Sequence, residues 1–248
     1  MCCFSGAVDH VADTRIFARP TANGRQLLAY QMTYSAAADV AMVLPLPVPA
    51  GSPDDALRFI NLEGYPELFD SLHALFPQPR TKGLSLMRSL SVSNEPPLAV
   101  VQVGSFEASF VPALAAFSRL DARFRISDAA WKQLPQYKDW GFAVFKLKKG
   151  NQSVHPMAFE FPRRDAKQVF FPTVHIHDGQ VHETAAFDHA LYLQPASGQF
   201  MHDAAWREST DLANSKLDGK RSQGLIDLNA HVYLRELRGA LKNADITV

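Results

Sequence analysis

Alternating apolar and polar positions near the start of the chain predict a β-hairpin. Thr14–Ala18 and Arg25–Tyr34 read as two strands, and Asn23 and Gly24 between them form the dipeptide that two-residue hairpin turns favour. Ala41–Leu46 is a continuous apolar run, which is typical of a buried strand. Prolines at the end of this run remove N–H donors and predict an extended exit.

The periodicity changes after this strand. Tyr65–Phe76 repeats apolar residues at helical spacing and has Pro66 in its first turn, so we expect an amphipathic helix. Gln78–Pro97 is rich in Ser, Pro and basic residues and predicts a long loop, a lid or a disordered insertion. Val111–Leu120 and Asp128–Tyr137 predict two shorter helical segments.

The second half of the chain reads mainly as strands: Gly141–Leu147, Met157–Phe161, Phe170–His177 and Val181–Leu193. Turn residues around Gly150 and at Asp178 and Gly179 predict that the first two and the last two pair as hairpins, in a β-meander. Asp203–Ala213 predicts a helix, and Ala230–Leu241 a strand or a helix. We therefore expect an α+β fold, a mostly antiparallel sheet packed against two or three helices. Residues 1–248 should form a single domain, with 78–97 as a flexible insertion.

Composition narrows the classes of partner. The chain has 248 residues, with 25 Lys and Arg against 25 Asp and Glu, so its formal charge is zero. Nucleic acid is not expected as a partner, because binding phosphates requires a basic surface. No apolar stretch has the length of a membrane-spanning helix, and the first residues lack the pattern of a secretory signal. We therefore expect a cytoplasmic protein that contacts no membrane.

Several segments together resemble the uncharacterised bacterial family DUF2330. They are CCF at 2–4, VDHVADTRIFAR at 8–19, AYQMTYSAAADVAMVLPLPVP at 29–49, VVQVGSFEASFVPAL at 100–114, YKDWGFAVFKLK at 137–148 and HPMAFEFPRRDAKQVFFP at 155–172. The resemblance implies a strand, a proline-rich strand exit, a helix, a glycine-aromatic strand and a proline-flanked strand in that order. Members of that family place a cysteine after a secretory signal, whereas Cys2 here follows Met1. The family has no established activity, so the resemblance implies a fold.

Histidines near residue 180 form the first candidate site. His175 and His177 are two apart on a predicted strand and should share a face. If Asp178 and Gly179 form a two-residue turn, His182 lies directly across from His175. Three imidazoles on one face are the ligand set of a catalytic metal with one open position, which points to zinc, copper or iron.

Acidic residues follow the histidines and could move protons. Asp188 would share the face of the histidines if the second strand stays regular, and Glu183 or His189 could take that place if a bulge intervenes. The alternative is an exposed hairpin tip whose histidines simply tolerate water.

The N-terminal thiols form the second candidate site. Removal of Met1 would leave Cys2 with a free α-amine beside its thiol, the arrangement that N-terminal nucleophile amidohydrolases use. Cys2 and Cys3 are alternatively small apolar residues packed at the first strand. A third interpretation joins Cys2 or Cys3 to the histidines in a mixed sulfur and nitrogen metal site.

Three functions follow from these candidates. The leading hypothesis is a metal-dependent enzyme, a hydrolase or an oxidoreductase, acting on a small-molecule substrate. Its metal ligands would be His175, His177 and His182, and Glu183 or Asp188 would transfer protons. The alternatives are a Cys2-dependent amidohydrolase and a non-catalytic metal-binding or ligand-binding module. The sequence leaves the oligomeric state open.

Overall fold

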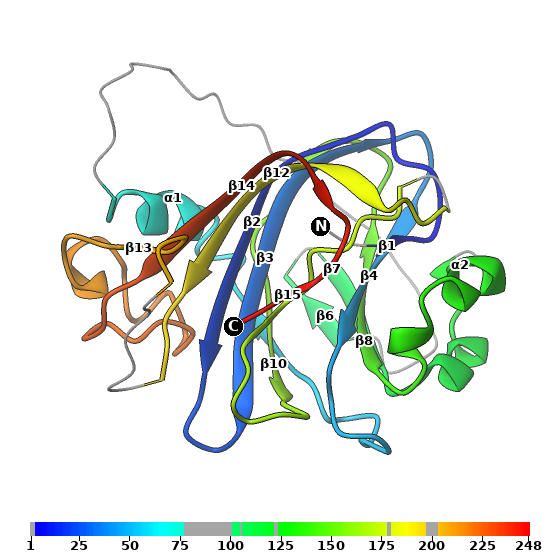
Figure 1. Ribbon diagram of the computed structural model, residues 1–248, viewed down its shortest axis with the longest axis horizontal. Coiled ribbons are helices and arrows are strands. Elements are labelled where there is room, and N and C mark those ends of the chain that lie inside the picture. Colours follow the sequence, from blue (N-terminus) through cyan, green and yellow to red (C-terminus); the bar gives the residue numbers. More distant parts are fainter. Residues whose placement is uncertain (1–2, 77–100, 105, 122–123, 178–179, 197–202) are drawn as a thin grey trace.

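A computed structural model describes residues 3–76, 101–104, 106–121, 124–177, 180–196 and 203–248 of the chain. Within them the chain forms mostly β-structure in three sheets (Figure 1). A five-stranded sheet has the strands, in spatial order, β1 Cys3–Phe4, β4 Val40–Leu46, β8 Gly141–Leu147, β7 Phe106–Val111 and β6 Val101–Val103. All neighbours in it are antiparallel.

The second sheet is larger and contains the longest strands. Its order is β13 Arg207–Glu208, β14 Tyr233–Lys242, β12 Thr184–Leu193, β2 His10–Pro20, β3 Arg25–Ala36, β10 Met157–Pro162 and β5 Arg58–Asn61, with β9 Gly150–Ser153 also paired to β3. β12 runs parallel to β2, whereas the other neighbours are antiparallel. The small third sheet pairs β11 Phe170–Phe171 with β15 Ile246–Thr247.

Helices in the described chain are short. They are α1 Leu68–His73, α2 Asp128–Lys132 and the 3-10 helices η1 Leu114–Arg119, η3 Pro135–Tyr137 and η4 Ala213–Ser215. The expected α+β fold, a sheet packed against two or three helices, is therefore wrong. The central core lies between two sheets. None of these helices combines the length and the hydropathy of a membrane span.

Alternating side chains divide the interior into layers. In β4, Met42 and Leu44 face the eight-stranded sheet, whereas Ala41 and Val43 face the opposite side, towards α2. In β3, Leu28 and its even-numbered neighbours face the five-stranded sheet, and the odd-numbered residues face α1. The period of two along each strand thus builds one central core between the sheets and two outer clusters.

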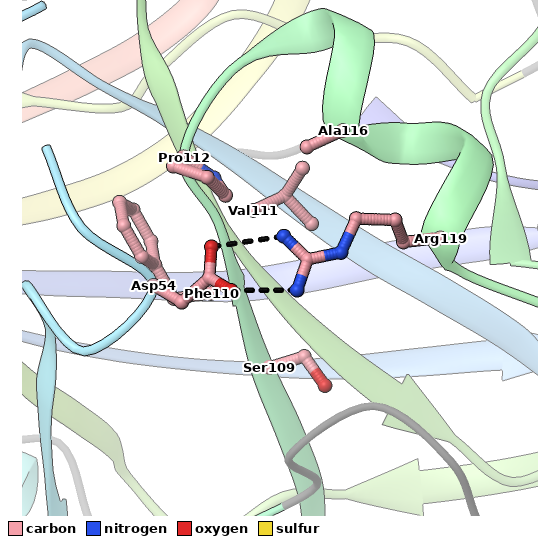
Figure 2. A pocket seen from close by; sticks show the side chains of 7 residues that line it. All are labelled: Asp54, Ser109, Phe110, Val111, Pro112, Ala116 and Arg119. Carbon is pink, nitrogen blue, oxygen red and sulfur yellow. Dashed lines mark hydrogen bonds and ion pairs between the residues drawn. The ribbon is translucent and has the colours of Figure 1, made fainter. Parts of the chain in front are cut away.

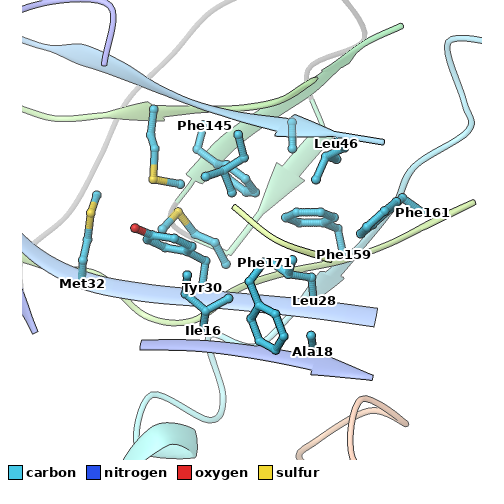
Figure 3. Packing of buried hydrophobic residues seen from close by; sticks show 14 of the residues in the cluster. Ile16, Ala18, Leu28, Tyr30, Met32, Leu46, Phe145, Phe159, Phe161 and Phe171 are labelled. Atoms are coloured by element: carbon cyan, nitrogen blue, oxygen red, sulfur yellow. The ribbon is translucent and has the colours of Figure 1, made fainter. Parts of the chain in front are cut away.

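Aromatic residues fill the central core (Figure 3). Phe145 from the five-stranded sheet meets Phe159 from the eight-stranded sheet with ring centroids 6.0 Å apart, and Phe159 lies 6.1 Å from Phe161. Tyr30 and Phe171 are fully buried in the same cluster. Close packing of this kind makes the core sensitive to any change of volume.

Gly141 provides a test of that packing. A Cβ added there would lie 2.6 Å from Cε2 of Phe110 and 2.8 Å from Cγ2 of Val48. We expect Gly141→Ala to lower the free energy of unfolding by about 2 kcal/mol, because overpacking forces side chains or backbone to shift. Urea denaturation measures the loss, and Gly64→Ala, whose Cβ would meet nothing within 4 Å, is the matched control. Equal stability of the two variants would contradict the packing described here.

Pairing of the strands differs from the expected β-meander. β8 and β10 lie in different sheets, so Gly141–Leu147 and Met157–Phe161 are not partners. Asp203–Ala213 contains the short strand β13 rather than a helix, and Ala230–Leu241 contributes most of β14. The flexible insertion predicted at 78–97 lies outside the described residues. The single-domain prediction stays a prediction.

Candidate functional site

The segment Thr173–His177 lies against the first strand of the chain. Ile176 forms a parallel bridge with Cys3, the N–H of Phe4 donates to the carbonyl of Ile176 at 3.1 Å, and the N–H of Val8 donates to His177 at 3.4 Å. Val174 and Ile176 belong to the outer cluster that includes Cys3. The intervening histidines therefore project from the opposite face, towards the interior between the sheets.

Three histidines gather on that interior side. His175 stacks on His177 with ring centroids 5.3 Å apart and on His189 with centroids 5.1 Å apart, both at an interplanar angle of 27°. His189 comes from β12, where it lies between the buried core residues Phe187 and Leu191. The prediction that His175 and His177 share a face is confirmed, but their third neighbour is His189 rather than His182.

We call His175, His177 and His189 the histidine stack. Aromatic rings pack against it, and its inner members are buried. The ring of Phe187 lies 4.4 Å from His175, and the ring of Phe4 lies 5.7 Å from His177. His175 is 6% exposed, and its Nε2 has no hydrogen-bond partner in the described chain. This is a buried and closely packed environment.

Burial controls the protonation of the two inner members. Desolvation, with the neighbouring His177 adding to it, lowers the pKa of His175 to about 2. Desolvation likewise lowers the pKa of His189 far below its usual range. Both imidazoles are consequently neutral at physiological pH, and neither is tuned to exchange protons near neutrality.

His182 does not lie across from His175. The predicted hairpin is absent from the described residues, because β12 begins only at Thr184 and pairs with β14 and β2. His182 is exposed, and its carbonyl accepts a hydrogen bond from Nδ2 of Asn243 at 2.9 Å. The long pairing with β14 determines the path of this segment, and the turn at 178–179 lies outside the described residues.

The expected metal site is not assembled. No group of three or more His, Cys, Asp or Glu side chains among the described residues could hold a metal ion, so the predicted metal-binding site at His175, His177 and His182 is wrong. Stacked rings direct their in-plane nitrogen lone pairs side by side rather than to one point, whereas zinc requires converging donors. Cys3 packs in the outer cluster, on the other side of the sheet from the histidine stack, and Cys2 lies outside the described residues.

The two candidate acids lie away from the histidine stack. Asp188 faces the opposite side of β12 from His189, where it forms an ion pair with Arg238 and accepts the N–H of Asp13 at 3.2 Å. Glu183 is exposed, and its carbonyl accepts the N–H of Asn243 at 2.8 Å. A regular strand thus places Asp188 and His189 on opposite faces. Asp188 therefore does not lie beside the histidine stack, where the predicted acid-base role requires it.

The C-terminal segment holds the histidine segment in place. Oδ1 of Asn243 accepts the N–H of His175 at 2.7 Å, and its Nδ2 donates to the carbonyl of His175 at 3.0 Å. Oδ1 of Asp245 accepts the N–H groups of Thr173 and Val174 at 2.8 and 3.0 Å, and its Oδ2 accepts the hydroxyl of Tyr137. Sequence reasoning missed these two residues. They match no sequence motif, so the sequence offered no signal for them.

One shallow pocket is open at the surface of the five-stranded sheet (Figure 2). Arg119 and Asp54 form a bidentate ion pair across it at 2.6 and 2.9 Å, and both side chains are about half exposed. Its volume of about 60 Å³ is well below the roughly 300 Å³ of small ligand sites. An exposed ion pair of this kind contributes little to stability.

Comparison with known proteins identifies the fold. No family model and no curated protein matches the chain, and the resemblance to DUF2330 stays a prediction. A crystal structure of baculovirus P35 is similar over 99% of this chain and 98% of its own, with 13% identity and a TM-score of 0.53. A mutated baculovirus P35 after caspase cleavage is similar over 95% and 99%, with 15% identity and a TM-score of 0.50. At this identity the likeness shows that the chain has a P35-like fold.

Proposed function

We propose that this chain is a protein that binds and inhibits a cysteine protease of the caspase class. The observation that supports the proposal best is the end-to-end likeness to baculovirus P35, which spans nearly all of both chains. One of the similar structures is a P35 that a caspase has cleaved. A likeness over the whole length preserves the relative position of both sheets, whereas a shared local motif would not.

The architecture described above agrees with this role. An inhibitor of a protease needs a rigid scaffold, because ordering a flexible chain on binding costs affinity. Three buried clusters and the Asn243 and Asp245 contacts supply such rigidity. A protein partner also replaces the small-molecule substrate of the sequence-based hypothesis, since the histidine stack is buried and neutral and its predicted acids lie elsewhere.

Residual protease activity tests the proposal. Purified chain is titrated against active-site-titrated caspases, and cleavage of a fluorogenic peptide is followed after incubation. We expect activity to fall in proportion to added chain and to approach zero near an equimolar ratio, as tight binding requires. Heat-unfolded chain is the control, because an inhibitor that depends on the fold loses its effect.

Two other outcomes are informative. Full caspase activity at about tenfold molar excess of folded chain would contradict the proposal. Inhibition of a papain-like cysteine protease without inhibition of any caspase would retain a protease inhibitor and overturn the caspase class. The Cys2-dependent amidohydrolase stays a prediction, since Cys2 lies outside the described residues.

A further inference from the structure

The strand β14 has one free edge over most of its length. It pairs with β12 along all ten of its residues, from Tyr233 to Lys242. On its other side β13 pairs only with Tyr233 and Leu234. No further strand of the described chain lies beside the part of β14 from Arg235 onward. Figure 1 shows β14 beside β12, towards the end of the eight-stranded sheet that β13 closes.

The hydrogen-bond pattern shows which residues direct their backbone to that edge. On the β12 side, the N–H of Asn243 donates to Glu183, and on the β13 side the N–H of Ser209 donates to Val232. Antiparallel strands alternate between these two directions at every residue. The even-numbered residues Glu236, Arg238 and Ala240 therefore direct their N–H and C=O groups outward. The carbonyl of Lys242 accepts the N–H of Ala244 at 3.0 Å, which leaves its N–H directed to the edge.

Side chains along the edge are open to solvent. Glu236, Arg238, Ala240 and Lys242 are exposed, and Leu241 is 38% exposed, one of two exposed large apolar side chains in the described chain. An edge with free donors and acceptors is a template for pairing with another strand. The sequence of the edge indicates which strand that is.

We propose that two copies of this chain associate through the free edge of β14, as antiparallel strands with the two-fold axis at Gly239. In this register Glu236 lies opposite the partner's Lys242, and Lys242 lies opposite the partner's Glu236. Leu237 meets the partner's Leu241 on the inner face, which covers the exposed leucine. Arg238 lies opposite the partner's Ala240, so no like charges oppose each other directly.

The outward backbone groups support this register independently of the charges. In an antiparallel pair, residues that exchange both hydrogen bonds lie directly opposite each other. The register pairs even-numbered residues with even-numbered residues, and these are the ones whose N–H and C=O groups face the edge. The order of charges along the strand and the outward direction of its backbone groups thus both agree with this register.

Gly239 suits the position on the axis. Its φ of +84° favours glycine, and a Cβ added there would meet nothing within 4 Å. Two backbones can therefore approach at the axis without a side chain between them. Charges on an edge often serve only to prevent aggregation. Charges of alternating sign in a self-complementary order attract a second copy instead.

The expected dimer is weak. Pairing Glu236–Lys242 with the same segment of a second copy buries less than the roughly 1,200 Å² that stable interfaces bury, so we expect association in the micromolar range. Glu236 also contacts Arg238 within its own chain at 3.2 Å, and Arg238 pairs with Asp188 of β12. These contacts direct Arg238 towards β12. Lys242 forms no ion pair within the described chain, so its side chain is available to the partner.

Analytical ultracentrifugation tests the dimer. The chain is sedimented from about 1 to 300 µM, concentrations that bracket the expected affinity. We expect the average mass to rise from 27.5 kDa towards twice that value. Lys242→Glu places two pairs of carboxylates opposite each other and should weaken association about tenfold or more. The double variant Glu236→Lys/Lys242→Glu restores opposite charges and should recover the wild-type dissociation constant.

Two further variants complete the test. Ala240→Pro removes an N–H that faces the edge and none that bonds β12, so it should weaken association while thermal unfolding confirms a folded chain. Lys148→Glu, the same charge change at the exposed residue that directly follows β8, is the matched control and should have no effect. A mass of 27.5 kDa at all concentrations would overturn the proposal. So would a dimer that is insensitive to Lys242→Glu and Ala240→Pro, because it would use another surface.

Discussion

Lowering the pH from about 7.5 to about 5.5 should reduce the free energy of unfolding by about 3 kcal/mol through the buried histidines. The pKa of His175 falls from 6.5 to about 2 on folding. His189 shifts in the same direction for the same reason, burial among apolar rings. Protons therefore bind the unfolded chain in preference to the folded one.

The sign follows from these two pKa values. A histidine whose pKa is lower in the folded state contributes stability that is fully present above the unfolded pKa of 6.5. That stability is lost as the pH falls below 6.5, at about 1.4 kcal/mol per pH unit and per histidine. The loss continues until the folded pKa is reached, near pH 2 for His175. The lowered pKa of His155 acts in the same direction.

Urea denaturation at the two pH values measures this loss, and His175→Gln/His189→Gln provides the comparison. Glutamine keeps a polar side chain that does not titrate. The raised pKa of Asp245 acts in the opposite direction and is present in both proteins, so the difference between them isolates the two histidines. We expect the double variant to lose about 3 kcal/mol less than the wild type over this range. Equal losses would show that His175 and His189 are protonated in the folded protein.

The second large effect concerns Asp245. Asp245→Ala should lower the free energy of unfolding by about 3 kcal/mol, because three donors lose their acceptor. These donors are the N–H groups of Thr173 and Val174 and the hydroxyl of Tyr137, a side chain that is 1% exposed. The same loss releases the C-terminal segment from the histidine segment, which it otherwise aligns.

Two milder variants separate the contributions at this position. Asp245→Asn keeps an oxygen for both N–H groups, so we expect it to retain most of the stability. Tyr137→Phe removes the hydroxyl that donates to Asp245 and should cost about 1 kcal/mol. Chemical denaturation of all three variants at one pH makes the comparison. If Asp245→Ala were as stable as Asp245→Asn, the contacts to Thr173 and Val174 would contribute nothing.

Local patterns predicted individual strands well. The Asn23-Gly24 turn joins β2 and β3 as expected, and Gly24 has a φ of +75°. Gly141–Leu147 matches β8 at both ends, and the apolar run Ala41–Leu46 covers all but the first residue of the fully buried strand β4. Period and turn chemistry are local properties, so the chain itself displays them.

Partners of those strands could not be predicted in the same way. β12 pairs in parallel with β2, about 175 residues earlier, and antiparallel with β14, and neither partner follows it through a tight turn. His189 joins the histidine stack only because β12 lies beside the segment that carries His175. The expected hairpin assumed that neighbours in sequence pair, and this assumption placed His182 in the site.

Residues that position the histidine segment through hydrogen bonds are harder still to predict from the sequence. Asn243 and Asp245 act through backbone groups of Thr173, Val174 and His175, about 70 residues away. Acceptors of this kind carry no motif, because any extended segment supplies the donors they bind. The fold was needed to show that these contacts position the segment that carries His175.

Size-exclusion chromatography of the chain mixed with an active caspase tests the proposed function most directly. An inhibitor and a mere substrate differ in what happens after contact, since a substrate is released and an inhibitor stays bound. We predict that chain and protease co-elute ahead of either alone and that the co-eluting protease is inactive. Separate elution of an active caspase, with the chain intact or cut into fragments, would contradict the account.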